Sequence, residues 1–263
     1  MPFGFYIIMA AQFFSALADN ALLIAAIFAL HEMQSPLWFD PMLKLLFTVS
    51  YVVLAGFVGA FADSMPKAKV MLISNTIKIA GCLLIFAGLN PLIGYAIVGL
   101  GAATYSPAKY GILTELLPPE KLVAANGWIE GLTVGSIILG TVFGGMLISN
   151  QLSLYLLSFD LPFFNTGIDT APEAAISVIA FIYLIAAAFN LKIPDTGAVY
   201  PQQETNPIRL VKDFEHCFRT LWTDRLGQIS LAVTTLFWGA GATLQFIVLK
   251  WAESALGMNL SEG

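Results

Sequence analysis

The feature that most constrains this chain is a series of seven apolar stretches, each about long enough to cross a lipid bilayer. They cover residues 3–30, 43–62, 70–89, 91–113, 123–148, 174–191 and 227–250. A helix needs about 20 apolar residues to span the hydrocarbon layer, and lipid offers no hydrogen-bonding partner to an irregular backbone. The sequence therefore predicts an all-α membrane protein with seven membrane-spanning helices.

The composition supports this prediction. Charged residues make up 11% of the chain, whereas a soluble domain carries about 25%. Such a deficit fits a protein whose outer surface faces lipid. The two cysteines differ in surroundings, since Cys82 lies in an apolar stretch and Cys217 in a polar segment, so we expect no disulfide.

Basic residues collect in alternate loops and predict the orientation. Among the loops that join the first six stretches, one set has Lys44 as its only basic residue. The other set and the polar segment 192–226 hold most of the rest: Lys67, Lys69, Lys109, Lys121, Lys192, Arg209, Lys212, Arg219 and Arg225. Because cytoplasmic loops are enriched in Lys and Arg, we expect a cytoplasmic N-terminus and a cytoplasmic segment 192–226.

The same pattern divides the chain into three parts. Residues 1–191 form a six-helix transmembrane half, residues 192–226 a cytoplasmic linker, and residues 227–263 a seventh transmembrane helix that begins an incomplete second half. In the linker, Asn206-Pro207 predicts a helix start. Apolar residues then recur at spacings of three and four, so the helix is amphipathic. It lies on the cytoplasmic membrane face or packs against the ends of the bundle, and the sequence leaves both open.

The loop after the second stretch carries Gly59, Asp63, Lys67 and Lys69. This spacing resembles the signature loop of the major facilitator superfamily, with the second basic residue one position late. Gly59 would let neighbouring helices approach, and Asp63 would pair with a basic side chain or cap a helix. We expect a latch that favours closure of the cytoplasmic face. The alternative is a solvated turn with positive-inside lysines.

Asp19 is the most informative single residue, because it lies near the middle of the first stretch. A carboxylate at that depth costs about 2.5–3.5 kcal/mol on insertion scales, so it should face a cavity or a partner. Gln12, Ser15 and Asp19 share one helical face. This face predicts a cavity-lining site for a cationic group or a coupling ion. The alternative is a paired carboxylate that only holds helices together.

Three further ionisable residues lie within or beside the apolar stretches. Lys78 is too deep to snorkel and is predicted to form an intramembrane ion pair, with Asp19 or Glu130 as candidate partners. Lys109 follows Pro107 and either binds an anionic phosphate or anchors the positive-inside end. Glu130 is a pair partner or part of the pathway.

The fifth stretch also holds glycines at intervals of four. A regular row of small residues lets membrane helices pack closely. We therefore predict that Gly127, Gly131 and Gly135 form a helix-packing seam.

Four runs give a more specific resemblance that spans essentially the whole chain. They are Asp19-Asn20-Ala21-Leu22-Leu23, the run from Tyr105 to Gly111, Ala125-Asn126-Gly127 with Glu130, and the run from Leu236 to Gly241. In these runs the sequence resembles the bacterial lysophospholipid transporter family of the major facilitator superfamily. The resemblance implies a flippase that moves lysophospholipids, chiefly lysophosphatidylethanolamine, from the outer to the inner leaflet of the bacterial inner membrane.

The resemblance also implies partners and site residues. A lysophospholipid acyltransferase would consume the product, the surrounding membrane lipid is the second partner, and no cofactor is implied. Residues of the first, fourth, fifth and seventh stretches would line the substrate pathway: Gln12, Asp19, Asn20, Tyr105, Lys109, Glu130 and Gln245. The sequence departs from the family in two ways. The family motif carries arginine where this chain has Gln245. The family also has twelve membrane helices, whereas seven are predicted for this chain.

Two other functions stay open at this point. One is a proton-coupled facilitator that exports amphipathic small molecules, with Asp19 or Glu130 titrating; the other is a fragment or scaffold that transports nothing. An enzyme is not expected, since no nucleophile–base pair or metal cluster is evident and His31 and His216 lie outside the apolar stretches. Scattered basic residues on one face also argue against nucleic acid binding.

Overall fold

The computed structural model describes residues 1–157, 168–200, 202–259 and 262, and within these residues the regular structure is entirely helical. The all-α prediction is therefore confirmed. The helices are α1 (Phe3–Glu32), α2 (Phe39–Asp63), α3 (Lys67–Phe86), α4 (Pro91–Leu116), α5 (Pro119–Leu147), α6 (Asn150–Leu157), α7 (Ala171–Leu191), α8 (Pro207–Thr223) and α9 (Arg225–Leu256).

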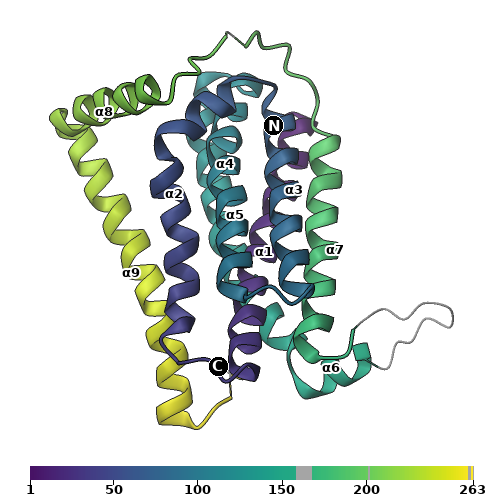
Figure 1. Cartoon of the computed structure of the whole chain (residues 1–263). Helices are drawn as coiled ribbons and strands as arrows, with labels where there is room; N and C mark the ends of the chain where they lie inside the picture. The colour runs from purple at the N-terminus through teal and green to yellow at the C-terminus, as the bar shows by residue number, and fades with distance from the viewer. Residues whose placement is uncertain (158–167, 201, 260–261, 263) are drawn as a thin grey trace.

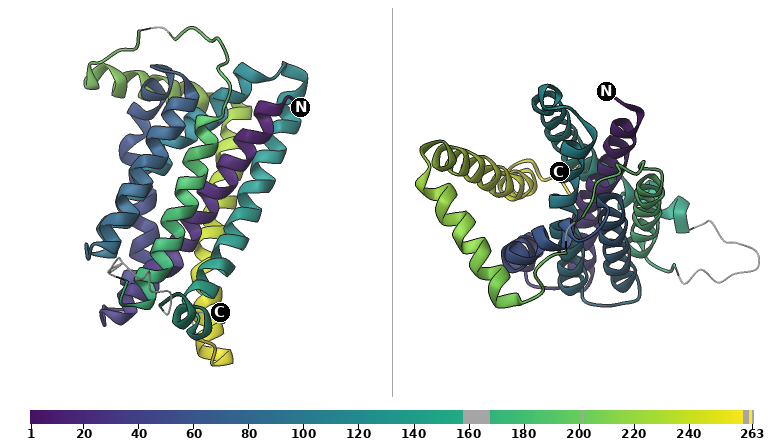
Figure 2. Two further views of the ribbon diagram at one scale, coloured as in Figure 1. Left: turned by 90° about the vertical axis from the view of Figure 1, so that its right-hand side faces the viewer. Right: turned by 90° about the horizontal axis from the view of Figure 1, so that it is seen from above.

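The long helices α1 to α5 and α7 run side by side in a bundle (Figure 1). The start of α1 and the linker after α7 lie at one end, which we call the linker end, and short α6 lies at the opposite end. Helix α8 extends sideways from the linker end next to α2, and α9 returns along the side of the bundle (Figure 2). In the most apolar window of α1, 72% of the residues are buried, against none in α9, so α1 is central and α9 peripheral.

Six helices of the described chain are long and apolar enough to cross a membrane: α1, α2, α3, α5, α7 and α9. The predicted fourth span corresponds to α4, which has 26 residues and therefore sufficient length. It falls short in apolarity because polar residues, among them Tyr105 and Lys109, interrupt it. Both of these side chains are buried inside the bundle, which explains how a less apolar helix is accommodated there.

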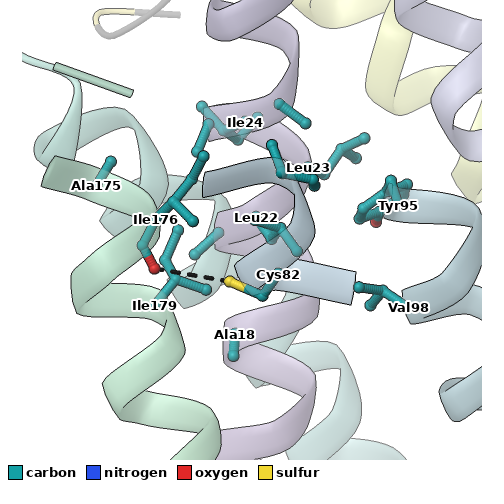
Figure 3. Packing of buried hydrophobic residues seen from close by; sticks show 14 of the residues in the cluster. Ala18, Leu22, Leu23, Ile24, Cys82, Tyr95, Val98, Ala175, Ile176 and Ile179 are labelled. Carbon is teal, nitrogen blue, oxygen red and sulfur yellow. Dashed lines mark hydrogen bonds between the residues drawn. The ribbon is translucent and has the colours of Figure 1, made fainter. Parts of the chain in front are cut away.

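The main core lies where α1, α3, α4 and α7 meet. Figure 3 shows Leu22 and Leu23 of α1 packed near Cys82, with Ile176 of α7 on one side. The Cys82 thiol donates a hydrogen bond of 3.6 Å to the Ile176 carbonyl oxygen. Cys82 is buried and Cys217 is exposed, and both are free in the structure.

Helix α5 packs on α1 through glycines, but not through the predicted ones. A Cβ atom added at Gly140 would lie 2.5 Å from the Leu17 carbonyl oxygen. At Gly127, Gly131 and Gly135 an added Cβ would meet no described atom within 4 Å. The predicted seam is therefore wrong within the described chain, because those three glycines face away from the neighbouring helices.

The contrast between Gly140, which touches α1, and Gly131, which does not, leads to a prediction about stability. Gly140→Ala forces α5 away from α1, and overpacking of this kind costs about 1–3 kcal/mol. Gly131→Ala is the matched control, because its methyl group enters open space. We expect a lower thermal unfolding midpoint in detergent for Gly140→Ala only; equal midpoints for the two variants would contradict this packing.

The linker helix α8 begins as predicted. The Asn206 side chain accepts a hydrogen bond of 3.0 Å from the Ile208 backbone amide, and Pro207 occupies the first helical position. Val211 and Phe214 contact α2, since a Cβ at Gly56 would lie 3.7 Å from each. Both apolar side chains nevertheless remain more than 40% exposed. Helix α8 thus packs on the end of α2 and still presents an apolar stripe.

Candidate binding cavity

A cavity of about 630 Å³ lies between the bundle and α9. Helices α1 to α5 supply most of its wall, and α9 adds Thr235, Trp238, Gly239 and Ala242. Six of the seven residues predicted for the pathway line this cavity: Gln12, Asp19, Asn20, Tyr105, Lys109 and Glu130. These six residues come from three helices, α1, α4 and α5, and therefore meet in one space although they are far apart in the sequence.

Asp19 forms an ion pair at this wall. The Lys78 ammonium lies 2.7 Å from one Asp19 carboxylate oxygen and donates a second hydrogen bond, of 2.9 Å, to the Ser15 hydroxyl. The Tyr183 hydroxyl donates to the other carboxylate oxygen at 2.7 Å. The predicted ion pair of Lys78 is thus present, and Asp19 rather than Glu130 is its partner.

The pair is deep but not sealed. The Lys78 side chain is 3% exposed and that of Asp19 is 13% exposed, and both line the cavity. An unpaired charge at this depth would be costly, whereas two opposite charges with additional hydrogen bonds stabilise each other. A cation in the cavity would have to share the Asp19 carboxylate with Lys78.

Lys109 stands in contrast to Lys78. Its side chain is buried, at 6% exposure, and its ammonium lies 4.4 Å from the centre of the Tyr110 ring. Within the described residues, no carboxylate oxygen lies within 4 Å of this ammonium. The nearby Glu130 carboxylate instead accepts a hydrogen bond from the Tyr110 hydroxyl. Lys109 therefore presents at the cavity wall a cation without an ion-pair partner among the described residues.

The remaining predicted residues contribute polar atoms of two kinds. Gln12 is used structurally, because its side-chain nitrogen donates to the Thr133 hydroxyl on α5 at 3.1 Å. The Tyr105 hydroxyl and the Asn20 side-chain oxygen are enclosed and have no hydrogen-bond partner in the described chain. Buried polar groups nearly always have partners, so these two atoms are available to water or to a ligand in the cavity.

Gln245 is the predicted pathway residue that does not line the cavity. It lies one turn beyond Ala242 on α9, is half-buried, and its side-chain nitrogen is enclosed without a partner in the described residues. Its part in the pathway stays a prediction.

Sequence reasoning missed Lys44, Tyr51 and Trp238, which all line the cavity. The pattern of basic loops marks Lys44 only as a loop charge. Its position relative to Phe47, Thr48 and Tyr51, at spacings of three, four and seven, puts all four on one helical face. That spacing is the signal that identifies them, and all four line the cavity.

The predicted latch residues lie at the linker end. Lys67 is buried, pairs with Asp63, and donates to the Ala62 carbonyl oxygen at 2.9 Å. Lys69 is exposed. An added Cβ at Gly59 would meet no described atom within 4 Å, so the expected close helix approach at this glycine is wrong for the described chain.

The linker contributes to this region in a way the sequence did not indicate. The Tyr200 ring lies 5.3 Å from the Lys67 ammonium. The hydroxyls of Tyr200 and Thr196 both donate to the Glu115 carboxylate at the end of α4, at 2.9 and 2.7 Å. The start of the linker is therefore fastened across the ends of α3 and α4. Burial and the neighbouring Glu115 carboxylate raise the pKa of Tyr200.

Comparison with known proteins agrees with this architecture. A family profile described as Major Facilitator Superfamily matches residues 6–263. The chain is 42% identical to the lysophospholipid transporter LplT of Yersinia enterocolitica, over 97% of this chain and 58% of that protein. It is 41% identical to LplT of Pectobacterium carotovorum and 43% identical to LplT of Yersinia pestis, over 95% of this chain and 57% of each relative. The chain thus spans less than three fifths of the length of these relatives.

Proposed function

The chain belongs to the major facilitator superfamily, and from this premise we propose that it serves in a secondary transporter that flips lysophospholipids across the bacterial inner membrane. We assign residues 1–191 to a six-helix transmembrane half, residues 192–226 to the linker, and residues 227–263 to a last part that holds most of the seventh membrane helix, α9 (Arg225–Leu256). The relatives' printed names, lysophospholipid transporter, support this substrate class.

Lys109, which is buried and has no ion-pair partner among the described residues, is the observation that carries the proposal. A lysine ammonium binds phosphate as a compact charge with three hydrogen-bond donors. Lys109 lies on a cavity wall that also contains apolar surface from Ala102, Ile137 and Trp238. A ligand with one phosphate and one acyl chain fits such a wall, because it needs both a cation and apolar contact.

The proposed direction is from the outer to the inner leaflet, with the N-terminus and the linker on the cytoplasmic side. The lysines and arginines near the linker end support this orientation. Lysophospholipid delivered there is the substrate of an acyltransferase, so we propose functional coupling to such an enzyme. The protein itself acts by transport rather than by catalysis.

We propose a conformational role for the linker-end cluster of Asp63, Lys67 and Tyr200. The Asp63–Lys67 pair and the Tyr200 ring over Lys67 hold the end of α2, the start of α3 and the linker together. A transport cycle that opens this end would have to loosen these contacts. Gly59 and Lys69 belong to the signature loop by their sequence positions, but they are not members of this cluster.

A proton-coupled exporter of amphipathic molecules is the second candidate. It is favoured by the two carboxylates on the cavity wall, Asp19 and Glu130, since acidic groups at membrane depth often serve as proton sites. This candidate predicts transport that follows a pH gradient.

Uptake of labelled lysophosphatidylethanolamine, compared between cells with and without the gene, tests the proposal. We expect gene-dependent accumulation in the inner leaflet and no gene-dependent movement of a monoacylglycerol, which lacks the phosphate. Movement driven by a pH gradient and indifferent to lysophospholipid would instead favour the exporter.

A further inference from the structure

Lys44 is a second lysine on the cavity wall with no assigned role. It lies on α2 and lines the same cavity as Asp19 and Tyr95, and its ammonium is 5.6 Å from the centre of the Phe47 ring. Within the described chain, no carboxylate oxygen lies within 4 Å of this ammonium. Of the three lysines that line the cavity, Lys44 and Lys109 are therefore unpaired, and Lys78 is neutralised by Asp19.

The two unpaired lysines lie at different depths. Lys44 precedes the linker-end residue Asp63 by 19 positions on α2, which at 1.5 Å per residue is about 28 Å from that end. Lys109 precedes Leu116, the last residue of α4, by seven positions, or about 10 Å. The cavity thus has one unpaired cation toward each end, separated by about 15–20 Å along the bundle.

The wall between these two levels suits a moving lipid head group. The Asp19–Lys78 pair lies there and carries no net charge when both groups are ionised. Tyr51 and Tyr105 also line the cavity at these levels, and aromatic rings offer both apolar contact and weak attraction for an ammonium. An anionic phosphate that leaves one lysine therefore meets a neutral, partly aromatic surface before it reaches the other.

We propose that Lys44 is a second phosphate-binding position, which receives the phosphate of a lysophospholipid at the end of the cavity opposite the linker. This inference rests on the proposed function and extends it. Lys44 and Lys109 then act in sequence, at the start and at the end of the movement of the head group. The competing role is an interfacial lysine that extends toward lipid head groups and only anchors α2.

Lys44→Gln is the test variant, with Lys44→Arg to retain the charge. Lys250→Gln is the matched control, because Lys250 lies at the same end of the molecule, pairs with Glu253, and is absent from the cavity lining. Initial rates of lysophosphatidylethanolamine uptake give KM and the maximal rate. We expect about a tenfold rise in KM for Lys44→Gln, the size of one charge-assisted hydrogen bond, and near-normal values for the other two variants.

Binding to the purified protein separates this inference from the proposed function. Lysophosphatidylethanolamine and glycerol 3-phosphate are titrated against each variant, with monoacylglycerol as the phosphate-free probe. If the unmodified protein binds lysophosphatidylethanolamine but does not move it, the proposed function fails, and weaker binding by Lys44→Gln still supports the site. If Lys44→Gln binds and transports as the Lys250→Gln control does, the assignment of Lys44 is overturned alone. If the unmodified protein neither binds nor transports lysophosphatidylethanolamine, the proposed function and the assignment of Lys44 are both overturned.

Discussion

Asp19→Asn is expected to abolish lysophospholipid uptake and also to destabilise the protein. The substitution leaves the Lys78 ammonium, with its side chain 3% exposed, without its carboxylate. Removing one partner of a buried ion pair typically costs about 3–5 kcal/mol, because the remaining charge stays buried and uncompensated. Thermal unfolding in detergent measures the stability, and uptake of labelled lysophosphatidylethanolamine measures the function.

A double variant separates the two effects. Asp19→Asn combined with Lys78→Met removes both charges, and replacing a buried pair by uncharged groups is often neutral for stability. We expect the double variant to recover most of the unfolding midpoint but not the uptake, because Asp19 also borders the cavity. Uptake restored together with stability would show that the pair only holds α1 and α3 together. Normal uptake by Asp19→Asn alone would remove any role for this carboxylate.

Much of the fold could be predicted from the sequence, because lipid imposes strong rules on a spanning chain. Stretches of apolar residues marked every long helix to within a few residues, and the Asn206-Pro207 pair marked the start of α8. The rules fail where a helix is shielded from lipid. Helix α4 carries buried polar residues, such as Lys109, so its apolarity alone does not identify it as a span.

For the candidate site, the sequence predicted which residues share a face of one helix, but not which residues of different helices come into contact. The spacing of Gln12, Ser15 and Asp19 put them on one face of α1, and all three line the cavity. The partner of Lys78 was not determined by the sequence, because Asp19 and Glu130 both offered a carboxylate. That choice depends on the rotation and tilt of α1, α3 and α5 in the bundle, which no local pattern encodes.

Glycine roles show the same limit. The sequence suggested packing at Gly59 and Gly131, yet close approach occurs at Gly140. A glycine permits close approach on whichever face meets a neighbour, and periodicity does not say which face that is. The contacts of Tyr200 with Lys67 and Glu115 were missed for a related reason, since an irregular linker has no period to analyse.

Lys109→Gln should cause a large loss of uptake, as Asp19→Asn does, but with little change in stability. Its ammonium has no carboxylate within 4 Å in the described chain, so no buried partner is left behind. A buried charge without a partner is itself unfavourable, and its removal should leave the unfolding midpoint equal or higher. Loss of a hydrogen bond to a charged group costs about 1.5–3 kcal/mol, or about 10- to 150-fold in binding.

The controls for this variant follow from the geometry. Lys109→Arg keeps the cation and should retain part of the uptake, whereas Lys121→Gln removes an exposed lysine at the start of α5 and should change nothing. Monoacylglycerol, which lacks the phosphate, should bind equally to Lys109→Gln and to the unmodified protein. If Lys109→Gln lowers the unfolding midpoint as much as Asp19→Asn does, Lys109 is a structural residue. If it moves lysophosphatidylethanolamine at the normal rate, the phosphate lies elsewhere on the cavity wall.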